Sequence, residues 1–265
     1  MPLTGLFQAR EDRSERHWKQ AMSGNSTILR SILLASGLAM APVVTAEDLY
    51  VPSVFPTLQD AIDEAEDGDH IHVAAGTYIG ALDFQGKAIV VEGTDGATET
   101  TLDVFGQGEL VSFSSGEGPG TVLRGFRIIG GTGNFVGDPG VLRGGAIYCE
   151  ESSPALENLI FEGNTATQGG AVYLQDSTAS IVGCSFLANE ASDGGAIHIR
   201  GGNPSISGSD FSSNEAYSRG GAIHSKQGSC SVTGTTFQKN VANNGGAFWL
   251  IESTLILTGS DVQEN

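Results

Sequence analysis

Apolar and polar residues alternate along short segments that recur through the second half of the chain. The segments GAIYC, GAVYL, GAIHI, GAIHS and GAFWL begin at residues 145, 170, 195, 221 and 246. One alternating set holds Gly145, Ile147 and Cys149, and the other holds Ala146 and Tyr148. Strict period-two alternation with β-branched residues predicts short strands that bury one face. A second strand is predicted in each repeat around one apolar residue: Leu156, Ile181, Ile206, Val232 and Leu257.

Two sequence motifs keep the same period. Double glycines stand at residues 144–145, 169–170, 194–195, 220–221 and 245–246, in steps of 25, 25, 26 and 25. A Phe-x-x-Asn motif follows the same register through Phe161, Phe186, Phe211 and Phe237 and through Asn164, Asn189, Asn214 and Asn240. A fixed period of this length is typical of a solenoid, in which each repeat stacks on the next. Because the pattern is that of strands, we predict a coil of parallel strands about 4.8 Å apart.

The two motifs have distinct predicted roles in such a coil. Glycine reaches positive φ and permits close backbone approach, so the double glycines are expected at a sharp corner of each turn. The asparagines are expected at another corner, where stacked side-chain amides can hydrogen-bond as a ladder. The phenylalanines are expected to fill the core beside that ladder.

The segment before the repeats predicts a cap. Leu58, Ala61, Ile62 and Ala65 follow the spacing of an amphipathic helix. Thr57, with Asp60 three residues on, suits the start of this helix and Gly68 suits its end. A helix placed there can cover apolar side chains and strand edges at the open end of a solenoid.

The chain is therefore divided into four predicted parts. Residues 1–46 have the pattern of a secretory signal peptide, with an apolar run after Arg30 and small residues at Val44 and Ala46. Met22 is an alternative start, and an uncleaved membrane anchor is the alternative role. Residues 47–70 form the helical cap, 71–143 irregular coils with a projecting loop at 131–143, and 144–265 regular repeats. The end at Asn265, on the asparagine column itself, predicts a truncated C-terminus.

The motifs also carry a resemblance. The segment TLQDAIDEAEDGDHIHVAAGTYIGALDFQGKAIVVEGTDG is similar to the opening of proteins with the pectin-lyase-like right-handed parallel β-helix. The GGAI and FxxN repeats resemble those of chlamydial polymorphic outer-membrane proteins. Together the resemblance covers roughly residues 55–265. It implies an all-β fold, right-handed winding, three sheets per coil and a place outside a bacterial cell or on its outer surface. It leaves the function open, because this fold carries lyases, hydrolases, epimerases, adhesins and tailspikes.

The composition of the chain restricts the classes of partner that it is expected to bind. The 265 residues carry a formal net charge of −18, which argues against a nucleic-acid partner because phosphates would be repelled. Contact with a membrane is expected only through the signal peptide or a missing C-terminal module. The three cysteines fall at different places within their repeats, which predicts buried thiols and no disulfide framework: Cys149, Cys184 and Cys230.

One outward column offers candidate chemistry. Its aromatic and imidazole rings are Tyr148, Tyr173, His198, His224 and Trp249. Two places further along, Arg200 and Lys226 add positive charge. Rings in a row suit stacking on sugars, and the cations suit uronate carboxylates, so these seven residues are the candidate binding site for an extracellular polysaccharide or a host or cell-surface glycan. The alternative is an ordinary exposed face of a sheet, where neighbouring aromatic side chains stabilise one another.

No catalytic or metal site is predicted. Asp210 and Asp261 share a column but lie two coils apart, and Asp83 and Asp103 have the context of turns. Ca²⁺ is compatible with the acidic charge, but no residues are assigned to it, and the pair His198 and His224 lacks a third ligand. We therefore predict a non-catalytic display or adhesion module. The alternatives are a polysaccharide lyase or glycoside hydrolase, and a structural spacer.

Overall fold

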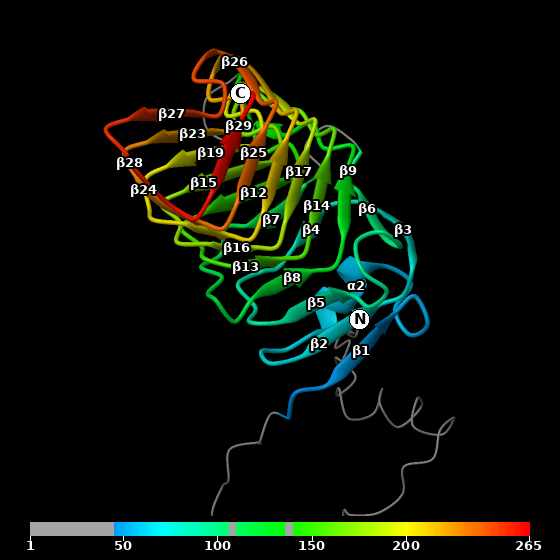
Figure 1. Ribbon diagram of the computed structural model, residues 1–265. Coiled ribbons are helices and arrows are strands. Elements are labelled where there is room, and N and C mark those ends of the chain that lie inside the picture. The colour runs from blue at the N-terminus through cyan, green and yellow to red at the C-terminus, as the bar shows by residue number, and fades with distance from the viewer. Residues whose placement is uncertain (1–44, 106–109, 136–139) are drawn as a thin grey trace, which may run out of the picture. The chain divides into compact units, whose positions relative to one another are not determined.

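The computed structural model describes residues 45–105, 110–135 and 140–265 (Figure 1). The predicted signal peptide lies almost wholly outside these residues. Within residues 45–265 the chain winds as an all-β, right-handed parallel β-helix with about 25 residues in each regular coil, as predicted. No helix in the described part of the chain is long and apolar enough to cross a membrane.

Three long parallel sheets form the walls of the coil. The nine-stranded sheet contains β1 (Asp48–Val51), β2 (His70–Val73), β5 (Val90–Gly93), β8 (Val122–Arg124), β13 (Ala155–Glu157), β16 (Ser180–Val182), β20 (Ser205–Ser207), β24 (Ser229–Thr233) and β28 (Thr254–Thr258). The eight-stranded sheet contains β3 (Gly76–Ile79), β6 (Thr100–Asp103), β9 (Arg127–Ile129), β14 (Ile160–Glu162), β17 (Ser185–Leu187), β21 (Asp210–Ser212), β25 (Thr236–Gln238) and β29 (Asp261–Gln263). The seven-stranded sheet contains β4 (Leu82–Asp83), β7 (Val111–Phe113), β12 (Ile147–Glu150), β15 (Val172–Gln175), β19 (Ile197–Arg200), β23 (Ile223–Lys226) and β27 (Phe248–Ile251).

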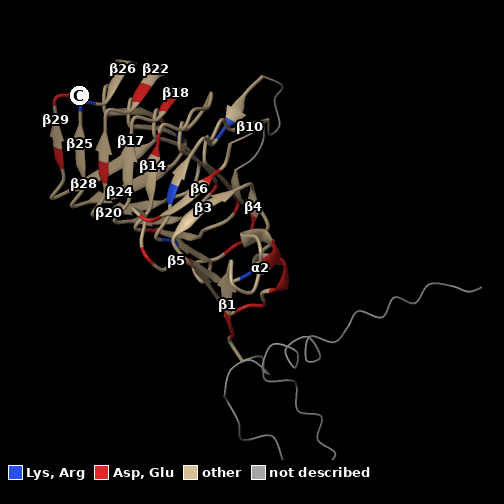
Figure 2. Ribbon diagram, turned by 90° about the vertical axis from the view of Figure 1, so that its right-hand side faces the viewer, with Lys and Arg blue, Asp and Glu red and all other residues tan. Residues whose placement is uncertain are grey.

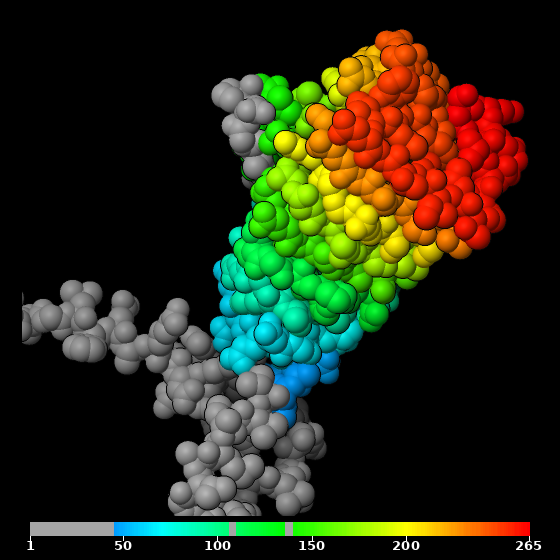
Figure 3. All heavy atoms as spheres, turned by 90° about the vertical axis from the view of Figure 1, so that its left-hand side faces the viewer, coloured from blue at the N-terminus to red at the C-terminus, as the bar shows by residue number. Residues whose placement is uncertain are grey.

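Equivalent residues of successive repeats lie directly above one another. Ile147 pairs with Val172, Val172 with Ile197, and Ile197 with Ile223, and all four side chains are fully buried. Figure 3 shows the coils as successive colour bands from blue to red. This stacking confirms the predicted solenoid, and the buried file of branched side chains is its core.

The asparagine and phenylalanine columns have the predicted roles. The side-chain Nδ2 of each asparagine donates to Oδ1 of the next, over 3.1 Å from Asn164 to Asn189, 3.0 Å from Asn189 to Asn214 and 2.9 Å from Asn214 to Asn240. All four asparagines are buried. Rings of the phenylalanine column stack beside them with centroids 4.4–4.8 Å apart. The ladder thus satisfies buried amides, while the stacked rings fill the adjoining core.

The double glycines meet two separate steric demands at their corner. The first glycine of each pair has positive φ, as at Gly194 with +70°. A Cβ on the second, Gly195, would lie only 2.2 Å from the carbonyl oxygen of Gly221 in the next coil. Any larger residue at the second position would therefore push adjacent coils apart.

The N-terminal cap contains the predicted helix and an additional strand. Helix α2 (Leu58–Glu64) buries Leu58, Ala61 and Ile62. Thr57 caps it by accepting a hydrogen bond from the Asp60 backbone N–H over 3.1 Å. The predicted end at Gly68 is wrong, because the backbone is already extended at Ala65. Strand β1, which the pattern did not predict, precedes the helix and pairs in parallel with β2.

A fourth short sheet follows the asparagine corner. It consists of β18 (Glu190–Asp193), β22 (Glu215–Arg219) and β26 (Val241–Asn244), and we call it the cover sheet. Single bridges from Asp193 to Gln168 and from Gln168 to Arg143 continue its line. Arg143 belongs to an antiparallel hairpin of β10 (Asn134–Phe135) and β11 (Leu142–Arg143), which forms within the loop at 131–143. The sequence pattern predicted neither the cover sheet nor this hairpin.

Candidate functional site

The predicted column of rings exists in the expected register. Tyr148, Tyr173, His198, His224 and Trp249 occupy paired positions on β12, β15, β19, β23 and β27. Successive ring centroids from Tyr148 to His224 lie 5.7, 5.2 and 4.5 Å apart. Tyr148 and Tyr173 pack with Leu110 in a cluster separate from the main core, so this column faces outward from the coil.

The column is nevertheless not an exposed surface. Tyr148, Tyr173, His198 and His224 are at most 4% exposed, whereas Trp249 is partly exposed. Residues of the hairpin and of the cover sheet lie against this face, and the Arg143 guanidinium sits 5.5 Å from the centre of the Tyr173 ring. The two tyrosine rings are therefore almost wholly buried, which corrects the expectation of an open aromatic stripe.

A groove of about 300 Å³ runs between these two layers. One wall comes from the seven-stranded sheet, through His198, Arg200, His224, Lys226 and Ile251. The other wall comes from the hairpin, the cover sheet and the bridge residue between them, through Val141, Arg143, Gln168, Asp193 and Arg219. The structure thus brings together four predicted residues, His198, Arg200, His224 and Lys226, and adds two cations that the sequence pattern did not predict, Arg143 and Arg219. A signal for them existed, since Arg143, Gln168, Asp193 and Arg219 each stand directly before a double glycine.

The groove is positively charged on an acidic chain. Four cationic side chains line it, with Asp193 as its one carboxylate. Within the described residues, no carboxylate lies within ion-pair distance of Arg200, Arg219 or Lys226. Acidic residues gather elsewhere, for example along helix α2 (Figure 2). An anionic ligand would therefore meet cations that no acidic side chain already neutralises.

The two histidines of the groove are neutral. Burial lowers the pKa of His198 to about 3, and burial also lowers the pKa of His224. Their Nδ1 atoms are 3.1 Å apart, so one imidazole donates to the other. Nε2 of His224 is buried and has no hydrogen-bond partner in the described structure.

A second and larger groove, of about 520 Å³, lies at the other end of the same sheet. Its lining includes Asp83, Ser112, Tyr148 and Glu150, and none of the described residues that line it is cationic. The Tyr148 hydroxyl donates to Glu150 over 2.8 Å, and burial raises the pKa of that tyrosine. Asp83 accepts a hydrogen bond from the Gln85 backbone over 2.9 Å, the turn role predicted for it. This groove presents oxygen atoms to a ligand and no charge complementary to an anion.

The cysteines take no part in either groove. All three are buried free thiols, as predicted: Cys149, Cys184 and Cys230. Burial raises the pKa of each thiol to about 12. They are packing residues without nucleophilic character at neutral pH.

Comparisons with known proteins support the repeat. Residues 158–175 and 208–226 match the model of the Chlamydia polymorphic membrane protein repeat. Each matched segment runs from the phenylalanine corner through the double glycine into the seven-stranded sheet, which are the parts that build the cationic groove. No match was found among the curated proteins.

Two alginate lyases are among the solved structures that the comparison found. A mutant of AlyGC, a PL6 family alginate lyase, shares 13% identity at a TM-score of 0.32, covering 81% of this chain and 40% of that one. The alginate lyase from Paenibacillus sp. str. FPU-7 shares 14% identity at a TM-score of 0.30, covering 82% of this chain and 98% of that one. Likenesses this low say nothing about activity.

Proposed function

We propose that this β-helix repeat protein acts outside the cell or at the cell surface as a display or adhesion module that binds an acidic polysaccharide in its cationic groove. The observation that carries the proposal is the set of three cations that face one groove and have no ion-pair partner among the described residues: Arg200, Arg219 and Lys226. The match to a repeat of membrane proteins supports the surface location.

The binding mode differs from the one that the sequence suggested. Because the tyrosines are covered, recognition relies on charge-assisted hydrogen bonds from Arg200 and Lys226, which are exposed, to uronate carboxylates. Trp249, which is partly exposed, is the one ring of the column that offers surface for stacking on a sugar.

The test measures the affinity of the protein for an immobilised polyuronate and for an immobilised neutral glucan of the same chain length. The variant Arg200→Gln with Lys226→Gln is expected to lose at least about tenfold in affinity for the polyuronate, since loss of about 1.4 kcal/mol corresponds to that factor. Lys239→Gln, an exposed cation outside the groove, is the matched control and should keep full affinity. Equal affinities of both variants and the parent protein would refute the site.

A second candidate function is a polysaccharide lyase, favoured by Nε2 of His224, which has no hydrogen-bond partner in the described structure and belongs to a residue that lines the groove. A lyase requires a base for the proton beside the uronate carboxylate and cations that stabilise the resulting charge. Formation of the unsaturated uronate, followed by its ultraviolet absorbance, tests this role in the parent protein and in His224→Gln. Binding of the polyuronate without turnover would leave the non-catalytic role standing.

A further inference from the structure

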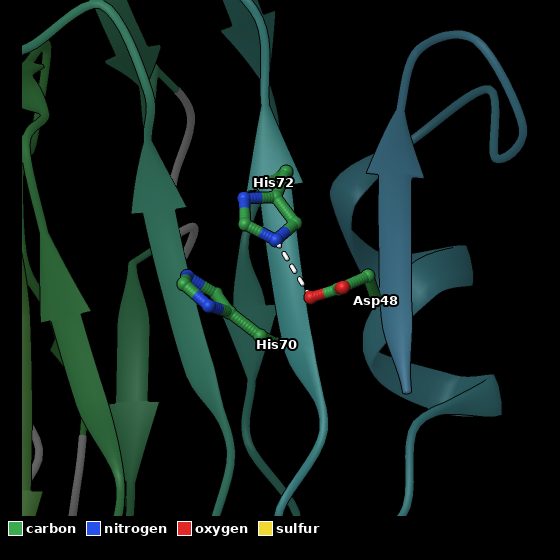
Figure 4. Close-up of side chains that lie close together, drawn as sticks. All are labelled: Asp48, His70 and His72. Carbon is green, nitrogen blue, oxygen red and sulfur yellow. Dashed lines mark hydrogen bonds and ion pairs between the residues drawn. The ribbon is translucent and has the colours of Figure 1, made fainter. Parts of the chain in front are cut away.

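A separate group of polar side chains lies on the nine-stranded sheet, at its N-terminal end. Strands β1 and β2 pair in parallel, with Asp48 opposite His70 and Tyr50 opposite His72. Side chains alternate along a strand, so Asp48, His70 and His72 share the outer face while Leu49 and Ile71 enter the core. Figure 4 shows the Asp48 carboxylate directed at the two imidazoles.

The ligand atoms of these three side chains lie close to the arrangement that one shared metal ion requires. Nε2 of His72 lies 2.8 Å from Oδ1 of Asp48, and the two imidazole centroids are 4.0 Å apart. One ligand atom from each of the three residues lies within 4.8 Å of the other two. Ligand atoms around a tetrahedral Zn²⁺ are about 3.3 Å apart, as bond lengths of about 2.0 Å require. Side-chain rotations that move the ligand atoms by about 1 Å would therefore bring them to the distances that such an ion requires.

A further carboxylate stands on the next strand, outside this group of three. Glu92 on β5 pairs with His72, and its Oε2 lies 2.9 Å from Nε2 of His70. That nitrogen atom is itself buried and faces the Glu92 carboxylate oxygen. Arg124 contacts the same Glu92 oxygen over 3.0 Å and so fixes the carboxylate beside the imidazoles. An ion bound between them would take this nitrogen and the Glu92 carboxylate as ligands.

We propose that Asp48, His70 and His72, with Glu92 as the fourth ligand, bind one divalent transition-metal ion of the Zn²⁺ class. Two imidazoles and two carboxylates suit this class, whereas Ca²⁺ and Mg²⁺ take oxygen ligands almost exclusively. Because the ligands come from β1, β2 and β5, the ion joins the first described strand to the coil. Its role is to fasten β1, which pairs only with β2 among the strands that the structure describes.

The experiment titrates the full, untagged chain with Zn²⁺ by calorimetry, in a His17→Gln background that removes the histidine outside the described residues. One ion per chain is expected to bind, and Zn²⁺ at a hundredfold excess over Kd should raise Tm by about 5 to 10 °C. Arg124→Gln, which removes the outer partner of Glu92, should weaken binding about 10- to 100-fold, and His72→Gln should weaken it further. Co²⁺ in place of Zn²⁺ should give the visible spectrum of a tetrahedral site.

The matched control is His224→Gln, which removes a histidine from the seven-stranded sheet and should bind Zn²⁺ like the parent chain. Far-ultraviolet circular dichroism establishes that each variant is folded before its affinity is compared. Absence of stoichiometric Zn²⁺ binding by the folded parent chain, a preference for Ca²⁺, or loss of binding in His224→Gln but not in His72→Gln would each overturn the proposal.

Discussion

The asparagine ladder makes the most sharply testable contribution to stability. Oδ1 of Asn189 accepts from the backbone N–H of Asn164 over 3.0 Å and from its Nδ2 over 3.1 Å. The Nδ2 group of Asn189 donates to Oδ1 of Asn214 and to the carbonyl of Phe161, both over 3.0 Å. One side chain therefore satisfies groups in the coils before and after it, and the perturbation we choose is Asn189→Ala.

The expected loss follows from the groups left without partners. Asn189→Ala removes the acceptor of two buried N–H groups of Asn164, and each such group costs about 1 to 3 kcal/mol. Together with the emptied volume, the free energy of unfolding should fall by about 3 to 5 kcal/mol. Asn189→Asp keeps an acceptor but places a carboxylate against Oδ1 of Asn214 and the carbonyl of Phe161. The folded-state pKa of this carboxyl would be raised, so the variant should regain stability as pH falls from 7 towards 5.

Urea denaturation followed by far-ultraviolet circular dichroism measures both variants. Asn203→Ala is the matched control, because Asn203 is exposed and lies outside the ladder, and it should change the free energy of unfolding by no more than about 0.5 kcal/mol. A loss below about 1 kcal/mol for Asn189→Ala, or one equal to that of Asn203→Ala, would refute the view that the ladder stabilises the coil.

Three further changes test other parts of the structure. Gly195→Ala places a Cβ 2.2 Å from a carbonyl oxygen and should cost at least about 3 kcal/mol in urea denaturation, against about 1 kcal/mol for Gly234→Ala, whose Cβ meets nothing. The pKa of His198 is lower in the folded protein than in the unfolded chain, so the stability present above pH 6.5 is lost as pH falls towards about 3. From pH 7 to pH 5 the free energy of unfolding should fall by about 2 kcal/mol, and the fall should be smaller in His198→Gln. The three buried thiols are those of Cys149, Cys184 and Cys230. They should react with a thiol reagent only after denaturation, and rapid reaction of the native chain would contradict their burial.

Most of the coil could be predicted because its signals repeat. The double glycine, the phenylalanine and the asparagine each recur at one position per coil, so a single sequence contains several independent observations of the same corner. Positions such as Ile147, Val172 and Ile197 were placed correctly because a period of 25 leaves only one stacking register. The cap helix was predicted for a local reason, since Thr57 and the apolar face from Leu58 lie within one short segment.

The candidate binding surface on the seven-stranded sheet was predicted less well than the coil, and Tyr173 shows why. Alternation says which face of a strand points away from the core, but it does not say what covers that face. The cover sheet has few alternating apolar residues, so its strands carry no strong pattern, and Arg143 reaches the tyrosine from a hairpin. The cluster of Asp48, His70 and His72 escaped notice similarly, because β1 is separated from β2 by the helix and its pairing is not local.

The strand period, the corners, the buried ladders and the buried state of the cysteines could all be predicted from the chain alone, because each depends on local geometry repeated at fixed spacing. Packing between distant segments determines that the ring column is covered and that Arg143 and Arg219 join Arg200 and Lys226 around one groove. These features depend on how a corner segment folds back over the neighbouring sheet. The course of that corner segment is determined by packing between segments that are distant along the chain. Neither the repeat period nor the composition predicts such packing.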